Sequence, residues 1–245
     1  HPDRSLLAVP SQRTQTIRLW DVVANREVAT LAHPGGPHSV TFSPDGSRLI
    51  SATGESVRVW NLLGNGEKRE LSAHHGVVNQ VKFSPDGQLL ATAGADARVR
   101  LWATSTWKPV SQFSVSPGVL GKVRRVAFSP DGKRLAAVDW AGAAAVFDIR
   151  SPSEPTRVQT LLSHERQEFG QILWDVAFSP DGKQLAVAAQ NGVWLWRDEQ
   201  RVAVVTDKPA IELAFTPDGR TLLWREPDHV HRWNLESSRE ESPPL

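Results

Sequence analysis

The chain has 245 residues, 40% of them hydrophobic, which is enough for one large core or two smaller ones. Its 28 lysines and arginines almost balance its 27 aspartates and glutamates, so the formal net charge of +1 offers no general attraction to nucleic acid or to an anionic membrane. It has no cysteine for a disulfide or a thiolate metal site, and no apolar stretch of the roughly 18 residues that a membrane-spanning helix needs. We therefore expect a cytoplasmic protein that does not enter a membrane. We disfavour nucleic acid as a partner; a nucleic-acid binder would need a basic stripe, with Arg124 and Arg125 as its local core.

One short sequence returns five times along the chain. It reads Phe-Ser-Pro-Asp-Gly, with Thr for Ser in the last copy, and its copies begin at Phe42, Phe83, Phe128, Phe178 and Phe215. Proline fixes φ, aspartate can bond to its own backbone, and glycine accepts a positive φ. Each copy therefore predicts a tight turn between two antiparallel strands.

A second marker follows each turn motif and also precedes the first copy. It is an aromatic residue in a Leu-Trp-Asp-like context, at Trp20, Trp60, Trp102, Phe147, Trp196 and Trp233. The period of about 40 residues is typical of propeller and solenoid repeats. Between the markers lie short runs rich in β-branched and aromatic residues, which predict strands. We divide the chain into six units within one domain, residues 1–245: 1–32, 33–73, 74–115, 116–163, 164–207 and 208–245.

A small twisted sheet with two apolar faces can bury both only by stacking between neighbours, and radial stacking gives a β-propeller. The predicted fold class is thus all-β, a propeller of four-stranded antiparallel blades with about six blades present. The first unit begins at its second strand, and the last ends in a proline-containing tail that makes a poor strand. We favour part of a larger ring, from a propeller of seven or more blades; a six-bladed ring is the alternative.

The Trp20-Asp21 pair and its variant Phe147-Asp148 make the chain resemble the WD-repeat family over essentially its whole length. The regular turn motif and the Ala/Arg-rich composition resemble bacterial WD-repeat proteins in particular. This resemblance implies a non-catalytic protein–protein interaction scaffold. It also implies the sensor or adaptor part of a larger bacterial signalling protein, with a signalling module fused to the propeller.

The resemblance further implies a buried network that joins a histidine, a serine or threonine, an aspartate and the marker tryptophan. In the third unit the matching residues are His74, Thr92, Asp96 and Trp102. In the second unit His33 and Trp60 match, but Gly54 stands at the aspartate position. The fourth and sixth units lack the histidine, so we expect them to rely on apolar packing.

No motif for catalysis emerges from the chain. His229 and His231 would share a strand face, but without a third ligand we favour a solvent-facing pair over a metal site. We therefore predict no enzyme activity and no cofactor. The alternative that stays open is a propeller enzyme or a ligand-binding domain with its site at the central channel.

The resemblance places partner contacts on the face formed by the loop before the first strand and the turn after the second strand. The residues that vary there within otherwise repeating surroundings are candidate partner-binding residues: His38, Asn79, Arg124, Arg125, Trp140 and Trp174. Trp and Arg are enriched at interface hot spots, so we expect a protein or peptide to bind at Trp140, Trp174 and Arg124. The alternative is that either tryptophan merely packs against its neighbouring loop.

Overall fold

The computed structural model describes residues 1–3, 5–63, 68–116, 121–162, 172–197 and 200–241. In these ranges the regular structure consists of strands, which form six antiparallel sheets. No helix in the described part of the chain is long and apolar enough to cross a membrane. The chain forms two compact units, residues 1–112 and 113–245, and each is described by itself.

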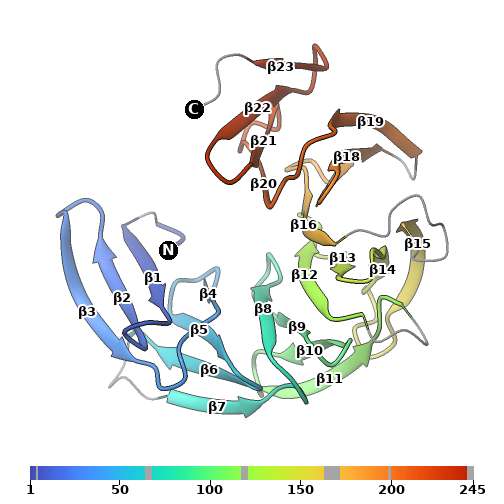
Figure 1. Ribbon diagram of the computed structural model, residues 1–245. Coiled ribbons are helices and arrows are strands. Elements are labelled where there is room, and N and C mark those ends of the chain that lie inside the picture. The colour runs from blue at the N-terminus through green and yellow to red at the C-terminus, as the bar shows by residue number, and fades with distance from the viewer. Residues whose placement is uncertain (4, 64–67, 117–120, 163–171, 198–199, 242–245) are drawn as a thin grey trace. The chain divides into compact units, whose positions relative to one another are not determined.

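The first unit contains three sheets, and the strands of each sheet follow one another along the chain (Figure 1). Sheet one consists of β1 (Leu6–Ser11), β2 (Thr16–Asp21) and β3 (Arg26–Ala32). Sheet two consists of β4 (Ser39–Phe42), β5 (Arg48–Thr53), β6 (Ser56–Asn61) and β7 (Lys68–Ser72). Sheet three consists of β8 (Val78–Phe83), β9 (Leu89–Gly94), β10 (Val99–Ala103) and β11 (Lys108–Phe113), whose last residue belongs to the second unit.

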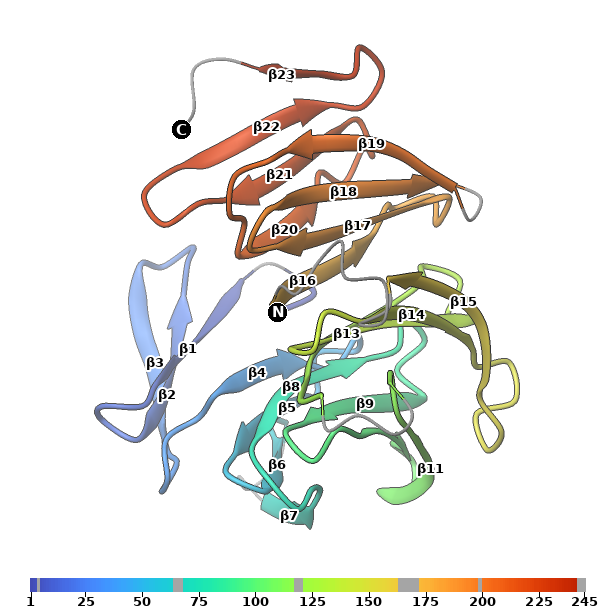
Figure 2. The ribbon, with the colours of Figure 1, turned by 45° about the vertical axis from the view of Figure 1, so that its right-hand side comes forward.

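The second unit repeats this plan in three further sheets of four strands each (Figure 2). Sheet four consists of β12 (Val123–Phe128), β13 (Arg134–Asp139), β14 (Ala144–Asp148) and β15 (Thr156–Leu162). Sheet five consists of β16 (Leu173–Phe178), β17 (Gln184–Ala189), β18 (Gly192–Arg197) and β19 (Gln200–Thr206). Sheet six consists of β20 (Glu212–Phe215), β21 (Thr221–Arg225), β22 (Val230–Asn234) and β23 (Arg239–Glu241).

These sheets confirm the predicted all-β fold of four-stranded antiparallel blades. Each of the six units predicted from the sequence contains one sheet. Sheet one has three strands, as expected for a unit that begins at its second strand. In sheet six a short outer strand does pair with β22, because its three residues lie ahead of the prolines.

The repeated turn is held by its serine and aspartate side chains. In the first copy the Ser43 hydroxyl accepts a hydrogen bond from Arg48 N at 3.0 Å and donates one to Asp45 Oδ1 at 2.5 Å, while Asp45 also accepts from Ser47 N. Gly46 has a φ of 69°, which confirms the predicted need for glycine there. The hydrogen bond from Ser43 lowers the pKa of Asp45. The same serine or threonine and aspartate contacts recur in the other four copies.

Within each unit the core lies between neighbouring sheets, and β17 shows why the sequence builds it. Successive side chains of a strand point to opposite faces. Leu185 and Val187 join a cluster with sheet four, whereas Ala186 and Ala188 join a cluster with sheet six. Both faces of the strand are therefore buried, and this explains why it carries a continuous apolar run rather than an alternating pattern.

Candidate functional site

The first strand of sheets three, four and five begins with a β-bulge. In sheet four Val123 pairs with Asp139 and Arg125 pairs with the preceding residue of β13, so Arg124 has no partner in the ladder. Trp174 in sheet five and Asn79 in sheet three occupy the equivalent bulge position. A bulge redirects the side chain of its extra residue, and here it does so at the positions that the sequence marked as variable.

In the second unit the bulges bring four side chains together, which we call the Trp–Arg cluster: Lys122, Arg124, Trp140 and Trp174. The Arg124 guanidinium carbon lies 4.1 Å from the centre of the Trp174 ring and 5.4 Å from that of Trp140. The Lys122 ammonium lies 5.3 Å from the Trp140 ring centre. Such distances are typical of cation–π interactions. The backbone also ties the cluster, because Trp140 N donates to Lys122 O at 3.0 Å.

The two tryptophans differ in how far they are free to meet a partner. Trp140, in the turn after β13, is 43% exposed. Trp174 is half-buried and packs against the apolar cluster between sheets five and six. Trp174 is therefore partly covered by its packing in the core, whereas Trp140 offers an aromatic surface to solvent.

Positive charge dominates around the cluster. Burial lowers the pKa of Arg124, neighbouring Arg125 lowers it further, and Asp175 acts in the opposite direction. Both carboxylate oxygens of Asp175 accept backbone hydrogen bonds, one of them from Leu213 N at 2.9 Å. The Nε atom of Arg124 is buried and has no hydrogen-bond partner. The cluster thus holds a guanidinium that is stacked on rings but incompletely satisfied by hydrogen bonds.

The other two candidate partner-binding residues belong to the first unit. His38 is exposed, and its Nδ1 lies 2.7 Å from Gln12 Nε2. Asn79 is half-buried at the bulge of β8. The structure therefore assembles Arg124, Trp140 and Trp174, with Arg125 beside them, within the second unit, while His38 and Asn79 are not part of this cluster.

The four network residues of sheet three lie within hydrogen-bonding distance of one another. His74 Nε2 is 2.7 Å from Thr92 Oγ1, His74 Nδ1 is 2.7 Å from Asp96 Oδ1, and Trp102 Nε1 donates to Thr92 Oγ1 at 3.2 Å. The sequence analysis did not predict Arg100, which stands two residues before Trp102 on the same strand. Its NH1 lies 2.7 Å from Asp96 Oδ2.

The carboxylate of Asp96 is ionised in this setting. Burial raises its pKa, but hydrogen bonds from Arg100 and His74 outweigh burial and lower the pKa to about 2. For His74 burial is the largest influence and lowers the pKa, against the opposing effect of Asp96.

Sheet two has a shorter version of the same arrangement. His33 Nε2 lies 2.7 Å from Ser51 Oγ, and Trp60 Nε1 donates to the same oxygen at 2.8 Å. The equivalence of Ser51 to Thr92 could have been found from the turn motif, because each stands nine residues after the phenylalanine of its copy, Phe42 or Phe83. His33 Nδ1, which corresponds to the ring nitrogen of His74 that faces Asp96, is buried without a hydrogen-bond partner.

Sheet four does not rely on apolar packing alone, so that expectation was wrong. Asp139 is fully buried, and it accepts a hydrogen bond from Ser116 Oγ at 2.9 Å and from the backbone N–H groups of Ala141 and Ala143. A serine thus replaces the missing histidine, and the aspartate stands two residues earlier than the spacing from Phe147 suggested.

Sheet six also has a buried histidine, in a different position. His231 is 8% exposed, its ring stacks on Trp224 at 4.9 Å, and its Nδ1 lies 2.7 Å from Glu240 Oε1. The predicted solvent-facing pair was wrong for His231, whereas His229 is exposed. Within the described residues no group of three His, Asp or Glu side chains could hold a metal ion.

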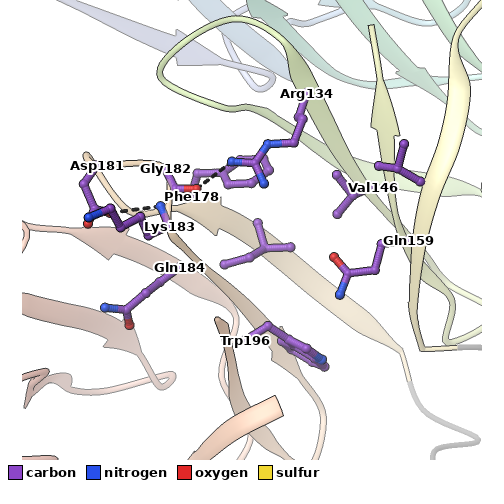
Figure 3. A pocket seen from close by; sticks show the side chains of 11 residues that line it. Arg134, Val146, Gln159, Phe178, Asp181, Gly182, Lys183, Gln184 and Trp196 are labelled. Carbon is purple, nitrogen blue, oxygen red and sulfur yellow. Dashed lines mark hydrogen bonds between the residues drawn. The ribbon is translucent and has the colours of Figure 1, made fainter. Parts of the chain in front are cut away.

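A groove of about 430 Å³ lies between β14 and β15 of sheet four and β16 to β18 of sheet five. Figure 3 shows its wall, where Arg134 reaches across Phe178 and donates to Gly182 O at 2.7 Å. The side chain of Gln159 points into the space near Trp196. The groove lies at the turn end of β16, whereas Trp174 stands at the other end of this strand.

Comparison with known proteins identifies the repeat. The family model described as "WD domain, G-beta repeat" matches residues 25–61, 66–103 and 155–197. Each matched segment begins before the outer strand of one sheet and ends with the third strand of the next sheet.

The curated relatives are longer proteins. The chain is 29% identical over 146 residues to the U3 small nucleolar RNA-associated protein 15 homolog of Xenopus tropicalis. This alignment covers 59% of the chain and 27% of the relative. It is 31% identical over 141 residues to eukaryotic translation initiation factor 3 subunit I of Debaryomyces hansenii, covering 55% and 39%. It is 30% identical over 160 residues to WD repeat-containing protein VIP3 of Arabidopsis thaliana, covering 60% and 50%.

The chain therefore spans between about a quarter and half of the length of these relatives. All three are eukaryotic, so they give no support to the bacterial resemblance. The repeated turn, the marker aromatics and the comparison agree: residues 25–61, 66–103 and 155–197 are similar to WD repeats, and each of these segments links one blade to the next.

Proposed function

We propose that this chain is a non-catalytic protein-interaction module that binds a protein or peptide through the Trp–Arg cluster. The observation that carries the proposal is the arginine stacked between two tryptophans, one of which is 43% exposed. Trp and Arg are the side chains that contribute most often to hot spots. A ring and a guanidinium that are already held in place lose little conformational freedom when a partner binds.

The wider role is also a proposal. The similarity to WD repeats supports a role as a scaffold. Two of the relatives are a translation initiation factor subunit and an RNA-associated protein, and these roles belong to those proteins. On the interpretation of the sequence given above, we propose that this chain acts in the cytoplasm as the sensor or adaptor part of a larger protein, with a signalling module fused to it. A bacterial setting for this role finds no support among the eukaryotic relatives.

The test is affinity capture from a lysate of the source cells, with the captured proteins identified by mass spectrometry. The variant Trp140→Ala removes the exposed ring. Trp107→Ala is a matched control, because Trp107 also stacks with an arginine, Arg48, at 5.3 Å, but in the first unit. We expect a defined set of proteins to be lost with Trp140→Ala and kept with Trp107→Ala. A set that both variants retain would contradict the proposed face.

A ligand-binding domain is the second candidate function, and the groove between sheets four and five favours it. Its volume of about 430 Å³ falls within the range of small-molecule sites. The groove is lined partly by β15, the outermost strand of its sheet, so it is not the central-channel site considered from the sequence. Val158 is 46% exposed at this groove, and Val158→Arg should abolish ligand-induced thermal stabilisation if a ligand binds there.

A further inference from the structure

We propose that the Trp–Arg cluster selects a partner segment rich in aspartate or glutamate. This inference rests on the proposed function, because it names the chemistry of the partner that binds the cluster. It is carried by the local balance of charge, by the state of Arg124 and by the position of the rings.

The first step is the local charge. Lys122, Arg124 and Arg125 stand within four consecutive residues at the start of β12, and Asp175 is the carboxylate that acts on Arg124. Asp175 already accepts two backbone hydrogen bonds, including that of Leu213 N. Arg125 in turn donates to the carbonyl oxygen of Arg124 at 3.1 Å. Asp139, which pairs with Val123 in the ladder, is a second carboxylate nearby, but it is fully buried and accepts hydrogen bonds from Ser116 Oγ and two backbone N–H groups. Three cations against two carboxylates still leave a positive surplus at the start of β12.

The second step is the state of Arg124. Burial and the charge of Arg125 both disfavour its charged form, and its Nε is buried without a partner. Since Nε itself is buried, a carboxylate would have to meet the terminal NH groups of this guanidinium, where it would form charge-assisted hydrogen bonds and offset the repulsion by Arg125. The gain is larger than at an exposed arginine, because solvent screens the pair less.

The third step is the position of the rings. Trp140 contacts both Lys122 and Arg124, so two cations are held beside one exposed aromatic surface. The ring restricts the motion of both cationic side chains and keeps water from one side of them. The surface therefore fits a short segment that contains glutamate or aspartate. Their carboxylates can meet the cations, and their methylene groups can pack on the Trp140 ring.

A nucleic acid is a weaker fit to the same residues. A phosphate backbone is tracked by cations spread along a groove or stripe, and its affinity grows with the number of phosphates neutralised. The cations of the cluster are confined to the start of one strand. RNA binding is accordingly an outcome that would overturn the inference.

The experiment measures the fluorescence anisotropy of labelled octaglutamate mixed with the full chain. The cluster variant is Lys122→Gln/Arg124→Gln/Arg125→Gln. The control variant removes the same charge at exposed turns of the same unit: Lys133→Gln/Lys183→Gln/Arg220→Gln. We expect the cluster variant to bind octaglutamate about tenfold more weakly than the wild type, and the control to bind within about twofold of it. Labelled octaglutamine should bind at least about tenfold more weakly than octaglutamate.

Equal weakening by the two triple variants, or equal binding of octaglutamine, would overturn the inference. So would octauridylate that binds more tightly than octaglutamate and depends on the cluster. Because half-buried Arg124 contributes to packing, Lys122→Gln alone serves as a second variant; its side chain is exposed, and we expect about threefold weaker binding. An unchanged affinity of this variant would also count against the inference.

The outcomes separate this inference from the proposed function. If lysate proteins are lost with Trp140→Ala but the cluster variant binds octaglutamate as tightly as the wild type, the proposed interaction face is supported and the preference for acidic segments is contradicted. If octaglutamate binding depends on the cluster but Trp140→Ala captures the same proteins as the wild type, the anion site stands and its proposed use as the partner face falls.

Discussion

Replacing Asp96 with alanine tests whether the buried network of sheet three stabilises the fold. The carboxylate is 11% exposed and contacts His74, Arg100 and the backbone N–H of His75. Its pKa of about 2, against an ordinary value of 3.8, corresponds to roughly 2.4 kcal/mol of preference for the ionised form. Allowing for solvent screening at the exposed edge, we expect Asp96→Ala to lower the free energy of unfolding by about 2 kcal/mol at pH 7.

The pH dependence has a defined direction. The pKa of Asp96 is lower in the folded state than in the unfolded state, so its contribution is present above about pH 4 and is lost as the pH falls towards about 2. The stability difference between wild type and variant should therefore be largest near neutral pH and should shrink below about pH 4.

The assay is urea unfolding followed by tryptophan fluorescence at several pH values, with Asp207→Ala as a control at an exposed aspartate. The control should stay within about 0.5 kcal/mol of the wild type. An Asp96→Ala midpoint at neutral pH that matches the control would refute the reasoning. A difference that persists undiminished at pH 3 would refute the assignment to the ionised carboxylate.

Three further predictions concern backbone strain, the second network and pH. Gly192→Ala should destabilise the chain by at least about 2 kcal/mol more than Gly54→Ala in thermal unfolding, because a Cβ would lie 2.3 Å from a carbonyl oxygen at Gly192 and meets no atom within 4 Å at Gly54. Ser51→Ala should cost about 1–3 kcal/mol in urea unfolding, since it removes the oxygen that His33 and Trp60 share; a cost equal to that of an exposed Ser→Ala change would contradict this. Burial lowers the pKa of His33, so the unfolded state binds a proton that the folded state resists, and stability should fall as the pH drops below about 6.5; His33→Gln should flatten this slope.

The turns and the strand order could be predicted from the sequence because their chemistry is local. A Ser-Pro-Asp-Gly segment carries its own hydrogen-bonding groups and its own backbone preferences, so Asp45 and Gly46 behave as expected. The network of Asp96 could also be predicted, because Asp96 stands at the expected spacing from the marker tryptophan, Trp102. Asp139 was missed because its partner is a serine and its position is shifted by two residues, and only the fold shows that it is buried.

The candidate site was predictable in its composition but not in its geometry. Variation at equivalent positions pointed to Arg124 and Trp174, yet their stacking depends on β-bulges that the residue types do not predict. Lys122 was overlooked because its role depends on the position of Trp140.

The repeated turn has a consequence for how such a chain could grow. Each turn is closed by bonds between residues five positions apart or fewer, so it forms without help from distant sequence and at little loop-closure cost. A gene segment that encodes one blade can therefore be duplicated and still fold its hairpin. The copies keep their turns and diverge at the bulges, where one blade now carries Arg124 and its neighbour Trp174. Arg124 and Trp174, which occupy the same position in neighbouring blades, thus contact each other across a blade boundary.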